Sequence, residues 1–293
     1  MGSSSRDAMR RLIASPTVTA VPGAANALTA RLAVEVGFEA VYVTGAGVAN
    51  TFLGAPDIGL VTLTELTAHV GAIREAVDVP LIVDADTGFG NAVGVRRTVR
   101  ELERAGADAI QLEDQRSPKR CGHFAGKELV GADEMVQKVR AAVEAREDER
   151  LAIIARTDAR ANEGFAAALD RATAYREAGA DVIFVEAPQT VEELRAIPEK
   201  LGGAQVVNLV EGGRTPLLPL DELNGFTIAL FANAALQGAI KGTLAALEEL
   251  HRTGSLVAAS RHLTGWAERQ RLVGKSFFDS LEERYAVRPP HVS

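Results

Sequence analysis

One phrase occurs three times along the chain and constrains its fold more than any other feature. Residues 34–44, 103–113 and 177–186 each pass from the end of a helical pattern, through a glycine, into a short apolar run. A glycine just after a helix commonly adopts a positive φ, and the apolar run has the length of a buried strand. Strands that alternate with helices in this way predict parallel βαβ units.

The 293 residues contain eight candidate strands, and most segments between them carry amphipathic helical patterns, as residues 133–145 do. The predicted strands are Thr17–Val21, Ala40–Thr44, Leu81–Asp84, Ala109–Glu113, Ala152–Arg156, Val182–Glu186, Gln205–Leu209 and Thr227–Phe231. Eight such units predict an α/β fold of the (β/α)8 TIM-barrel type, with an open doubly wound sheet as the alternative. We expect a barrel domain over residues 1–253. A C-terminal segment, residues 254–293, would carry helices near 255–261 and 266–271 that pack on the barrel or on a partner subunit.

Composition excludes several classes of function. The net charge is −7 and no basic stripe occurs, so nucleic acid is not an expected partner. No apolar run approaches the roughly 20 residues of a membrane span, and the N-terminus lacks the apolar core of a signal peptide. A single cysteine excludes a disulfide framework and suits a reducing compartment, so we expect a cytoplasmic protein.

Polar side chains gather where the predicted strands end. In a TIM barrel the active site lies at the carboxyl ends of the strands. The residues expected there are Tyr42, Thr44, Asp84, Asp86, Glu113, Asp114, Arg156, Asp158, Glu186, Asn208 and Glu211. So many carboxylates indicate that a positive charge sits among them.

Three of these carboxylates predict a metal site. Asp84 and Asp86 leave one strand in the same direction, and Glu113 takes the matching place on the next strand. Oxygen ligands without a cysteine or histidine cluster favour Mg²⁺, and Mn²⁺ would also fit. The alternative is that the two aspartates cap the following helix.

Residues 44–47, Thr-Gly-Ala-Gly, complete neither a dinucleotide-binding nor a P-loop motif. They predict either a backbone cradle for a small carboxylate or a plain flexible loop. Arg156 is expected to bind a carboxylate bidentately, to pair with Asp158 or Glu186, or to do both. Tyr42 is either a site residue or a core tyrosine.

The only cysteine, Cys121, lies in a polar stretch between Lys119-Arg120 and Gly122-His123. Nearby positive charge favours the thiolate, so we expect acid/base chemistry from this thiol rather than a buried apolar role. Residues 115–131 contain several glycines and form either a lid or a mobile surface loop.

Five phrases together resemble the isocitrate lyase/phosphoenolpyruvate mutase superfamily, over nearly the whole chain. They are Val83–Gly90, Glu113–Gln115, Lys119–His123, Ala155–Ala159 and Glu211–Leu217. The Lys-Arg-Cys-Gly-His phrase is similar to that of the carbon–carbon lyases, in the branch with the 2-methylisocitrate lyases, the 2,3-dimethylmalate lyases and the petal death protein.

The resemblance implies a role for each matching residue. Asp86, with Asp84 and Glu113 partly through waters, would hold Mg²⁺. Catalysis would fall to Cys121 as the acid, Tyr42 as the acceptor of the substrate's hydroxyl proton, and Arg156. The implied substrate-binding residues are Thr44, Gly45, Ala46, Asp57, Lys119, Arg120, Gly122, His123, Glu186, Asn208 and Asn233. The resemblance also implies a homotetramer in which subunits exchange the last barrel helix.

The expected reaction is Mg²⁺-dependent cleavage of a 2-hydroxy di- or tricarboxylate, of the substituted malate or 2-methylisocitrate type. The products would be pyruvate or glyoxylate and a second carboxylate. Alternatives are hydrolysis or decarboxylation of oxaloacetate on the same site, and a non-catalytic barrel that binds a small acid. Asn233 departs from the Pro, Thr or Ser of relatives, which leaves the second half of the substrate open.

Overall fold

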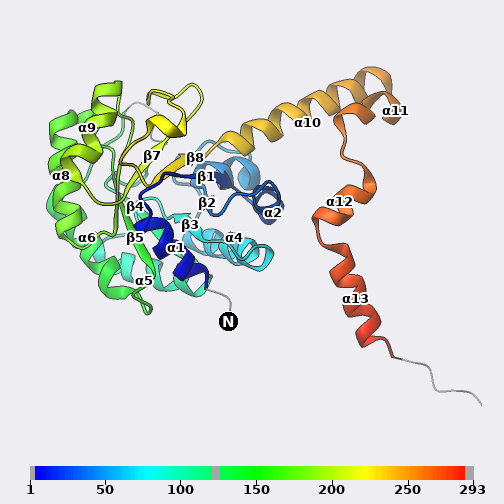
Figure 1. Cartoon of the computed structure of the whole chain (residues 1–293), viewed down its shortest axis with the longest axis horizontal. Helices are drawn as coiled ribbons and strands as arrows, with labels where there is room; N and C mark the ends of the chain where they lie inside the picture. Colours follow the sequence, from blue (N-terminus) through cyan, green and yellow to red (C-terminus); the bar gives the residue numbers. More distant parts are fainter. Residues whose placement is uncertain (1–3, 121–125, 288–293) are drawn as a thin grey trace, which may run out of the picture. The chain divides into compact units, whose positions relative to one another are not determined.

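The computed structural model describes residues 4–120 and 126–287. Eight parallel strands close into a barrel, in which each strand pairs with the next along the chain and β8 pairs with β1. Helices lie around the outside of this ring (Figure 1). The predicted (β/α)8 barrel is confirmed, and the open sheet is excluded because the ring formed by the described strands is closed.

The strand bounds follow the predictions closely. The strands are β1 (Thr19–Ala24), β2 (Val41–Val43), β3 (Leu81–Asp84), β4 (Ala109–Glu113), β5 (Ala152–Thr157), β6 (Val182–Val185), β7 (Gln205–Asn208) and β8 (Ile228–Phe231). Only β1 differs by more than one residue at either end. It extends beyond Val21 because its ladder continues through Pro22, paired with Phe231, and Gly23, paired with Tyr42.

The helices before β8 are α1 (Ser5–Ala14), α2 (Ala27–Glu35), α3 (Gly45–Val48), the π-helix η1 (Ala49–Leu53), α4 (Leu63–Ala76), α5 (Ala92–Arg104), α6 (Ala132–Ala145), α7 (Ala159–Asn162), α8 (Phe165–Glu177), α9 (Val191–Leu201) and the 3₁₀ turn η2 (Leu220–Glu222). The glycines of the repeated phrase follow α2, α5 and α8. Gly37, Gly106 and Gly179 have φ values of +98°, +101° and +107°. Each therefore ends its helix in a conformation that a Cβ disfavours, as predicted.

Helix α1 closes the end of the barrel where the strands begin. Met9 and Leu12 are buried in the same cluster as the inward-facing residues Ala109, Ala152 and Val182, which open strands β4, β5 and β6. The opposite end of the barrel is therefore the one available for a site.

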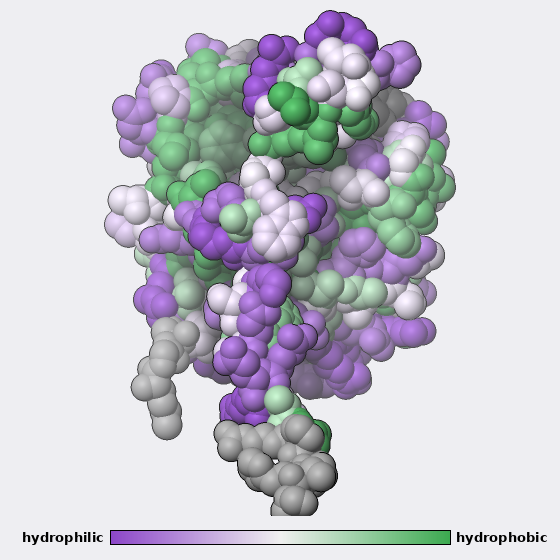
Figure 2. Space-filling view, turned by 90° about the vertical axis from the view of Figure 1, so that its right-hand side faces the viewer, coloured by the Kyte–Doolittle hydropathy of each residue, from purple (hydrophilic) through white to green (hydrophobic). Residues whose placement is uncertain are grey.

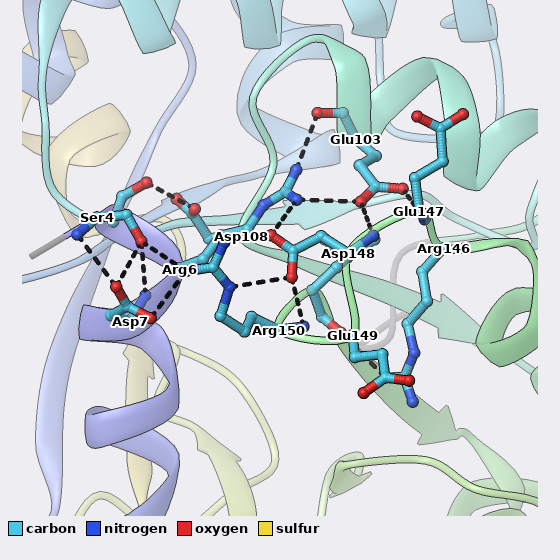
Figure 3. Close-up of polar contacts among 12 residues, drawn as sticks. Ser4, Arg6, Asp7, Glu103, Asp108, Arg146, Glu147, Asp148, Glu149 and Arg150 are labelled. Atoms are coloured by element: carbon cyan, nitrogen blue, oxygen red, sulfur yellow. Dashed lines mark hydrogen bonds and ion pairs between the residues drawn. The ribbon is translucent and has the colours of Figure 1, made fainter.

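Polar contacts fix α1 at this end (Figure 3). Arg6 pairs with Glu103 at 3.1 Å and with Asp148 at 2.9 Å. Asp148 also pairs with Arg150, which reaches Asp7 of α1 at 3.0 Å. Ser4 accepts a hydrogen bond from the backbone of Asp7 and completes a capping box, so the helix start is stabilised locally as well.

The chain divides into two compact units, Met1–Gln237 and Gly238–Ser293, with the boundary inside α10 (Ala234–Thr253). The second unit continues with α11 (Leu256–Ala259), η3 (Ser260–His262), α12 (Trp266–Leu272) and α13 (Lys275–Tyr285). Helix α13 was not predicted. It begins after Gly274, whose φ of +73° interrupts the chain between α12 and α13.

The second unit exposes many apolar side chains. They are Ile240, Leu244, Leu247, Leu250, Leu256, Val257, Leu263, Trp266, Val273, Phe277, Phe278, Tyr285 and Val287. The face of the molecule in Figure 2 carries apolar surface, coloured green, among hydrophilic residues. None of the described helices combines the length and apolar character that crossing a membrane requires.

Candidate active site

A pocket lies where the strands end. Its walls are formed by Tyr42, Thr44, Ala46, Asp57, Asp84, Glu113, Lys119, Arg120, Arg156, Glu186, Asn208, Val210, Leu230, Ala232 and Asn233. Two further predicted residues, Gly45 and Asp86, contact residues of this wall. The Gly45 amide nitrogen lies 3.4 Å from Asp84 Oδ2, and Asp86 Oδ1 lies 2.8 Å from Lys119 Nζ. The structure thus gathers every described residue to which the resemblance assigned catalysis, substrate binding or metal binding.

The predicted metal ligands are held in different ways. Asp84 Oδ1 accepts hydrogen bonds from Gln111 Nε2 at 3.1 Å and from the Asp86 amide at 3.2 Å. Asp86 has a φ of +49°, a left-handed conformation that a non-glycine residue keeps only when its surroundings impose it. Glu113 Oε1 is buried and accepts no hydrogen bond from any residue that the structure describes. A buried carboxylate oxygen without a donor is suited to a cation.

Negative charge exceeds positive charge around the pocket. Six carboxylates meet four cations there. They are Asp57, Asp84, Asp86, Glu113, Asp158 and Glu186 with Lys119, Arg120, Lys127 and Arg156. Burial raises the pKa of Asp86 to about 7, against the opposing effect of Lys119. Burial also raises the pKa of Glu113 well above its usual value. A divalent cation would relieve this excess.

The described residues contain no ready-made group of three or more Asp, Glu, His or Cys side chains in coordinating positions. Asp84 is occupied by its hydrogen bonds, and Asp86 by Lys119. Mg²⁺ commonly takes only one or two carboxylates directly and keeps several waters. The donor set around Asp86 and Glu113 therefore fits Mg²⁺ held largely through water.

Arg156 makes both ion pairs that the sequence allowed. Its Nε and Nη2 bind the carboxylate of Asp158 bidentately, at 2.9 and 3.0 Å. Its Nη1 lies 3.3 Å from Glu186 Oε2, and its guanidinium lies over the Phe184 ring, 5.1 Å from the ring centre. The guanidinium is thus fixed in orientation, with its Nη1 side toward Glu186 in the pocket wall.

Tyr42 is both buried and part of the pocket wall. Its hydroxyl donates to Gln111 Oε1 at 2.6 Å, and Gln111 in turn donates to Asp84. Burial, and then the charge of Asp84, raise the pKa of Tyr42 well above its usual value. Burial alone disfavours a phenolate, whereas a cation bound near Asp84 and Glu113 would favour it. The role of Tyr42 as acceptor of the substrate's hydroxyl proton stays a prediction. As it stands, Tyr42 is a hydrogen-bond donor.

The segment after β2 is helical rather than a loop. Thr44 caps α3 by accepting from the Gly47 amide at 3.3 Å, and α3 runs directly into η1. Of the two alternatives for residues 44–47, the plain flexible loop is therefore wrong, and the carboxylate cradle stays a prediction. Gly45 is needed for close approach, because a Cβ there would lie 3.1 Å from Asp84 Oδ2 and 3.2 Å from Asp86 Oδ1.

Two asparagines complete the far wall. Asn208 at the end of β7 donates to Glu186 Oε2 at 3.4 Å. Asn233 follows β8. The Oδ1 atoms of both asparagines are buried and have no hydrogen-bond partner within residues 4–120 and 126–287. Both amides therefore keep an unused acceptor at the pocket.

The described ends of the 115–131 segment are pinned. Gln115 and Leu129 form an antiparallel bridge. The Gln115 side-chain amide donates to the Arg120 carbonyl through Nε2 and accepts from the Arg120 amide through Oε1. Lys119 pairs with Asp57 and Asp86, and Lys127 Nζ lies 2.5 Å from Asp158 Oδ1. The predicted residues Cys121, Gly122 and His123 lie outside the described residues.

Sequence reasoning missed two residues that support the site. Gln111 links Tyr42 to Asp84 from within β4, and Lys127 pairs with Asp158. Gln111 is a polar residue within an apolar strand, which is the one signal that could have found it. Glu211, by contrast, was expected near the site but is exposed and absent from the pocket wall.

Known proteins are similar to this chain in both sequence and fold. A family model described as phosphoenolpyruvate phosphomutase matches residues 9–251. The 2,3-dimethylmalate lyase of Eubacterium barkeri is 45% identical over 95% of this chain and 97% of its own length. The 2-methylisocitrate lyase of Aeropyrum pernix is 45% identical over 84% of this chain and 80% of its own. The prediction of a lyase-type enzyme is thereby confirmed.

Solved structures of similar proteins have the same fold. A 2,3-dimethylmalate lyase, described as a PEP mutase/isocitrate lyase superfamily member, has a TM-score of 0.90 at 35% identity, covering 97% of this chain and 96% of its own. Oxaloacetate acetylhydrolase with 3,3-difluorooxalacetate gives 0.91 at 31% identity, covering 96% and 97%. Phosphonopyruvate hydrolase with oxalate and Mg²⁺ gives 0.87 at 31% identity, covering 97% and 99%. The chain belongs to the phosphoenolpyruvate mutase/isocitrate lyase superfamily.

Proposed function

We propose that this enzyme is a Mg²⁺-dependent carbon–carbon lyase that cleaves a 2-hydroxy di- or tricarboxylate, preferably a substituted malate. The observation that carries the proposal is the pocket itself, where an excess of buried carboxylates surrounds the fixed guanidinium of Arg156. The buried carboxylates support a bound cation, and the guanidinium supports an anionic substrate. The 45% identity to a 2,3-dimethylmalate lyase favours a substituted malate over isocitrate.

Asp86 and Glu113, with Asp84 behind them, would hold the metal. When bound, Mg²⁺ would neutralise carboxylate charge and polarise the oxygens at C2 of the substrate. Asp84 contributes by orientation, because its hydrogen bond from the Asp86 amide at 3.2 Å fixes the turn that carries Asp86.

The remaining polar groups divide between the two halves of the substrate. Arg156 would bind a carboxylate through Nη1, the nitrogen that Asp158 does not hold. Asn208 and Asn233 would accept hydrogen bonds through oxygens that have no partner among the described residues. Tyr42 would accept a hydrogen bond from the substrate's hydroxyl, because its own proton is donated to Gln111 Oε1.

Retro-aldol cleavage transfers the proton of the C2 hydroxyl to a base, the role proposed for Tyr42 once its own proton has left. It breaks the C2–C3 bond and leaves that bond's electron pair on C3. C3 then needs a proton, and the residue proposed to give it is Cys121. A thiol is a stronger acid than a hydroxyl, and the flanking Lys119 and Arg120 motivate this assignment from the sequence.

A substrate panel with and without Mg²⁺ tests the proposal. 2,3-Dimethylmalate, 2-methylisocitrate and isocitrate should each be assayed for their keto acid, and oxaloacetate for oxalate and acetate. We expect Mg²⁺-dependent release of pyruvate, fastest from 2,3-dimethylmalate. If isocitrate gave the highest kcat/KM, the substrate assignment would be wrong.

Oxaloacetate hydrolysis is the second candidate, favoured by the TM-score of 0.91 to oxaloacetate acetylhydrolase. Release of oxalate and acetate, without keto acid from any hydroxy acid, would establish it instead. Pyruvate and CO₂ from oxaloacetate would indicate decarboxylation.

We further propose a homotetramer in which subunits exchange their C-terminal helices. The support is the apolar surface of the second unit, where every described α10 residue is at least partly exposed and Leu244, Leu247 and Phe277 are each more than half exposed. Such a surface is usually covered by a partner in solution. Light scattering coupled to gel filtration should give four chains, and a monomer at micromolar concentration would contradict the exchange.

A further inference from the structure

Asp114 directly follows the proposed ligand Glu113, yet it lines no part of the pocket. Its exposed fraction is 0%. Its Oδ2 accepts from Thr157 Oγ1 at 2.7 Å, Tyr175 OH at 2.8 Å and Arg171 Nη1 at 3.4 Å. Its Oδ1 accepts from the backbone amide of Asp158 at 2.9 Å. One carboxylate therefore joins the end of β5 to helix α8.

Asp158, whose amide Asp114 binds, contacts two cations at the site. Asp158 binds Arg156 bidentately and also binds Lys127 Nζ at 2.5 Å. Asp158 has φ −95° and ψ 8°, a sparsely populated backbone conformation. The bond from its amide to Asp114 stabilises that conformation.

The backbone of Asp114 adds a second contact with β5 and one with the end of the 115–131 segment. Its amide donates to the Arg156 carbonyl at 3.2 Å, and its carbonyl accepts from the Val130 amide at 2.9 Å. Val130 follows the bridge that closes the 115–131 segment. Asp114 thus contacts both the strand that carries Arg156 and the end of the segment that carries Lys127.

We propose that Asp114 is a positioning residue that fixes Asp158, and through it sets the orientation of Arg156 and Lys127 for substrate binding. The inference rests on the proposed function only for the role of Arg156 as the carboxylate-binding group. The side-chain contacts of Asp114 lead to β5 and α8 rather than to Asp84 or Asp86. Of the proposed metal ligands only Glu113 is connected to this network, because its Oε2 lies 3.5 Å from Arg156 Nε. Metal binding should therefore depend on Asp114 much less than substrate binding does.

Asp114→Asn is the first test. The amide keeps the size of the side chain, but its NH₂ group must face either the Asp158 amide or the donors from Thr157 and α8. We expect KM for 2,3-dimethylmalate to rise about tenfold, as for other supporting contacts, with kcat changed much less. Oxalate affinity in the presence of Mg²⁺, measured by calorimetry, should fall by a similar factor. Mg²⁺ affinity alone should change much less than oxalate affinity.

Tyr175→Phe is the matched control. It removes one donor to Asp114 on the α8 side and leaves the bond to Asp158. It should lower the melting temperature while KM and oxalate affinity stay within about twofold, because loss of a hydrogen bond alone affects stability. An equal loss of oxalate affinity in both variants would overturn the proposal, since the effect would then be general loosening.

A second pair keeps the proposal testable if Asp114→Asn fails to fold. Thr157→Val removes the hydroxyl that donates to Asp114, whereas Thr157→Ser keeps it. We expect weaker oxalate binding in the first and recovery in the second. Unchanged oxalate affinity in folded Thr157→Val and Asp114→Asn would also overturn the role of Asp114. Oxalate binding does not require turnover, so failure of the proposed reaction would be recognised separately.

Discussion

The carbonyl oxygen of Ala232 occupies the space that a side chain on Gly23 would need. A Cβ built on Gly23 would lie 1.9 Å from that oxygen and 2.6 Å from the carbonyl carbon. The close approach lets the chain turn from β8 into the pocket wall, where Ala232 and Asn233 lie. The contact is between backbones, so no side-chain rotation can relieve it.

Gly23→Ala should therefore displace residues 232–233 and weaken the site. We expect a loss of stability of about 1–3 kcal/mol or more, as overpacking gives, together with lower substrate affinity. The control is Gly71→Ala in the middle of α4, where a Cβ meets nothing within 4 Å. That change should be neutral or stabilising by up to about 1 kcal/mol. Thermal denaturation of both variants checks the contrast, and equal stability of the two would contradict it.

Asp86→Asn should abolish most Mg²⁺ binding while preserving the fold. Asparagine tolerates the φ of +49° better than alanine, so the backbone should keep its conformation. Burial already disfavours the charged form of Asp86, with its pKa raised to about 7, so removing the charge should not cost much stability. Calorimetric titration should show little Mg²⁺ binding, and kcat/KM should fall by roughly 10²-fold. Exposed Glu211→Gln should bind Mg²⁺ normally; normal binding by Asp86→Asn would remove Asp86 from the metal site.

Arg156→Lys should raise KM and lower stability together. Lysine keeps the charge but cannot bind Asp158 through two nitrogens, so we expect a loss of about 1.5–3 kcal/mol. Arg160→Lys is the comparison, because Arg160 pairs with Glu193 at 2.8 Å away from the pocket wall. Only the first variant should show a higher KM. Chemical denaturation and steady-state kinetics measure the two effects.

The network at α1 should make stability depend on acid pH. Hydrogen bonds and ion pairs from Arg150 and Arg6 hold the pKa of Asp148 well below its usual value (Figure 3). A lowered folded-state pKa stabilises the fold above the unfolded pKa of about 3.9 and loses this effect as the pH falls toward the folded value. Asp148→Asn should therefore lower the melting temperature at pH 7, and the difference from wild type should shrink below about pH 4. A constant difference would mean that the charge is not responsible.

Cys121→Ser should leave circular dichroism and Mg²⁺ affinity unchanged and reduce turnover by roughly 10²-fold or more, as loss of a general acid does. The change is conservative in size, so a folding defect is not expected. Turnover near that of wild type would reassign the proton donor.

Much of this protein can be predicted from local sequence. The glycines at 37, 106 and 179 end helices because only glycine adopts their positive φ without strain, and the apolar runs after them are buried. That periodicity gives the barrel, and the barrel gives the end at which Asp84, Glu113 and Arg156 must meet. These features depend on neighbours in sequence and on one general rule of the fold.

The partners of each side chain were decided by tertiary structure. Nothing in the sequence pairs Asp114 with Tyr175, Lys127 with Asp158, or Gly23 with Ala232, because each contact joins residues on different elements. The phenol of Tyr42 donates to Gln111, and its pKa is raised by burial and by Asp84, and the chain order alone places neither residue beside it. Residue types and strand order set which groups reach the pocket, whereas burial and long-range contacts set their charge and orientation.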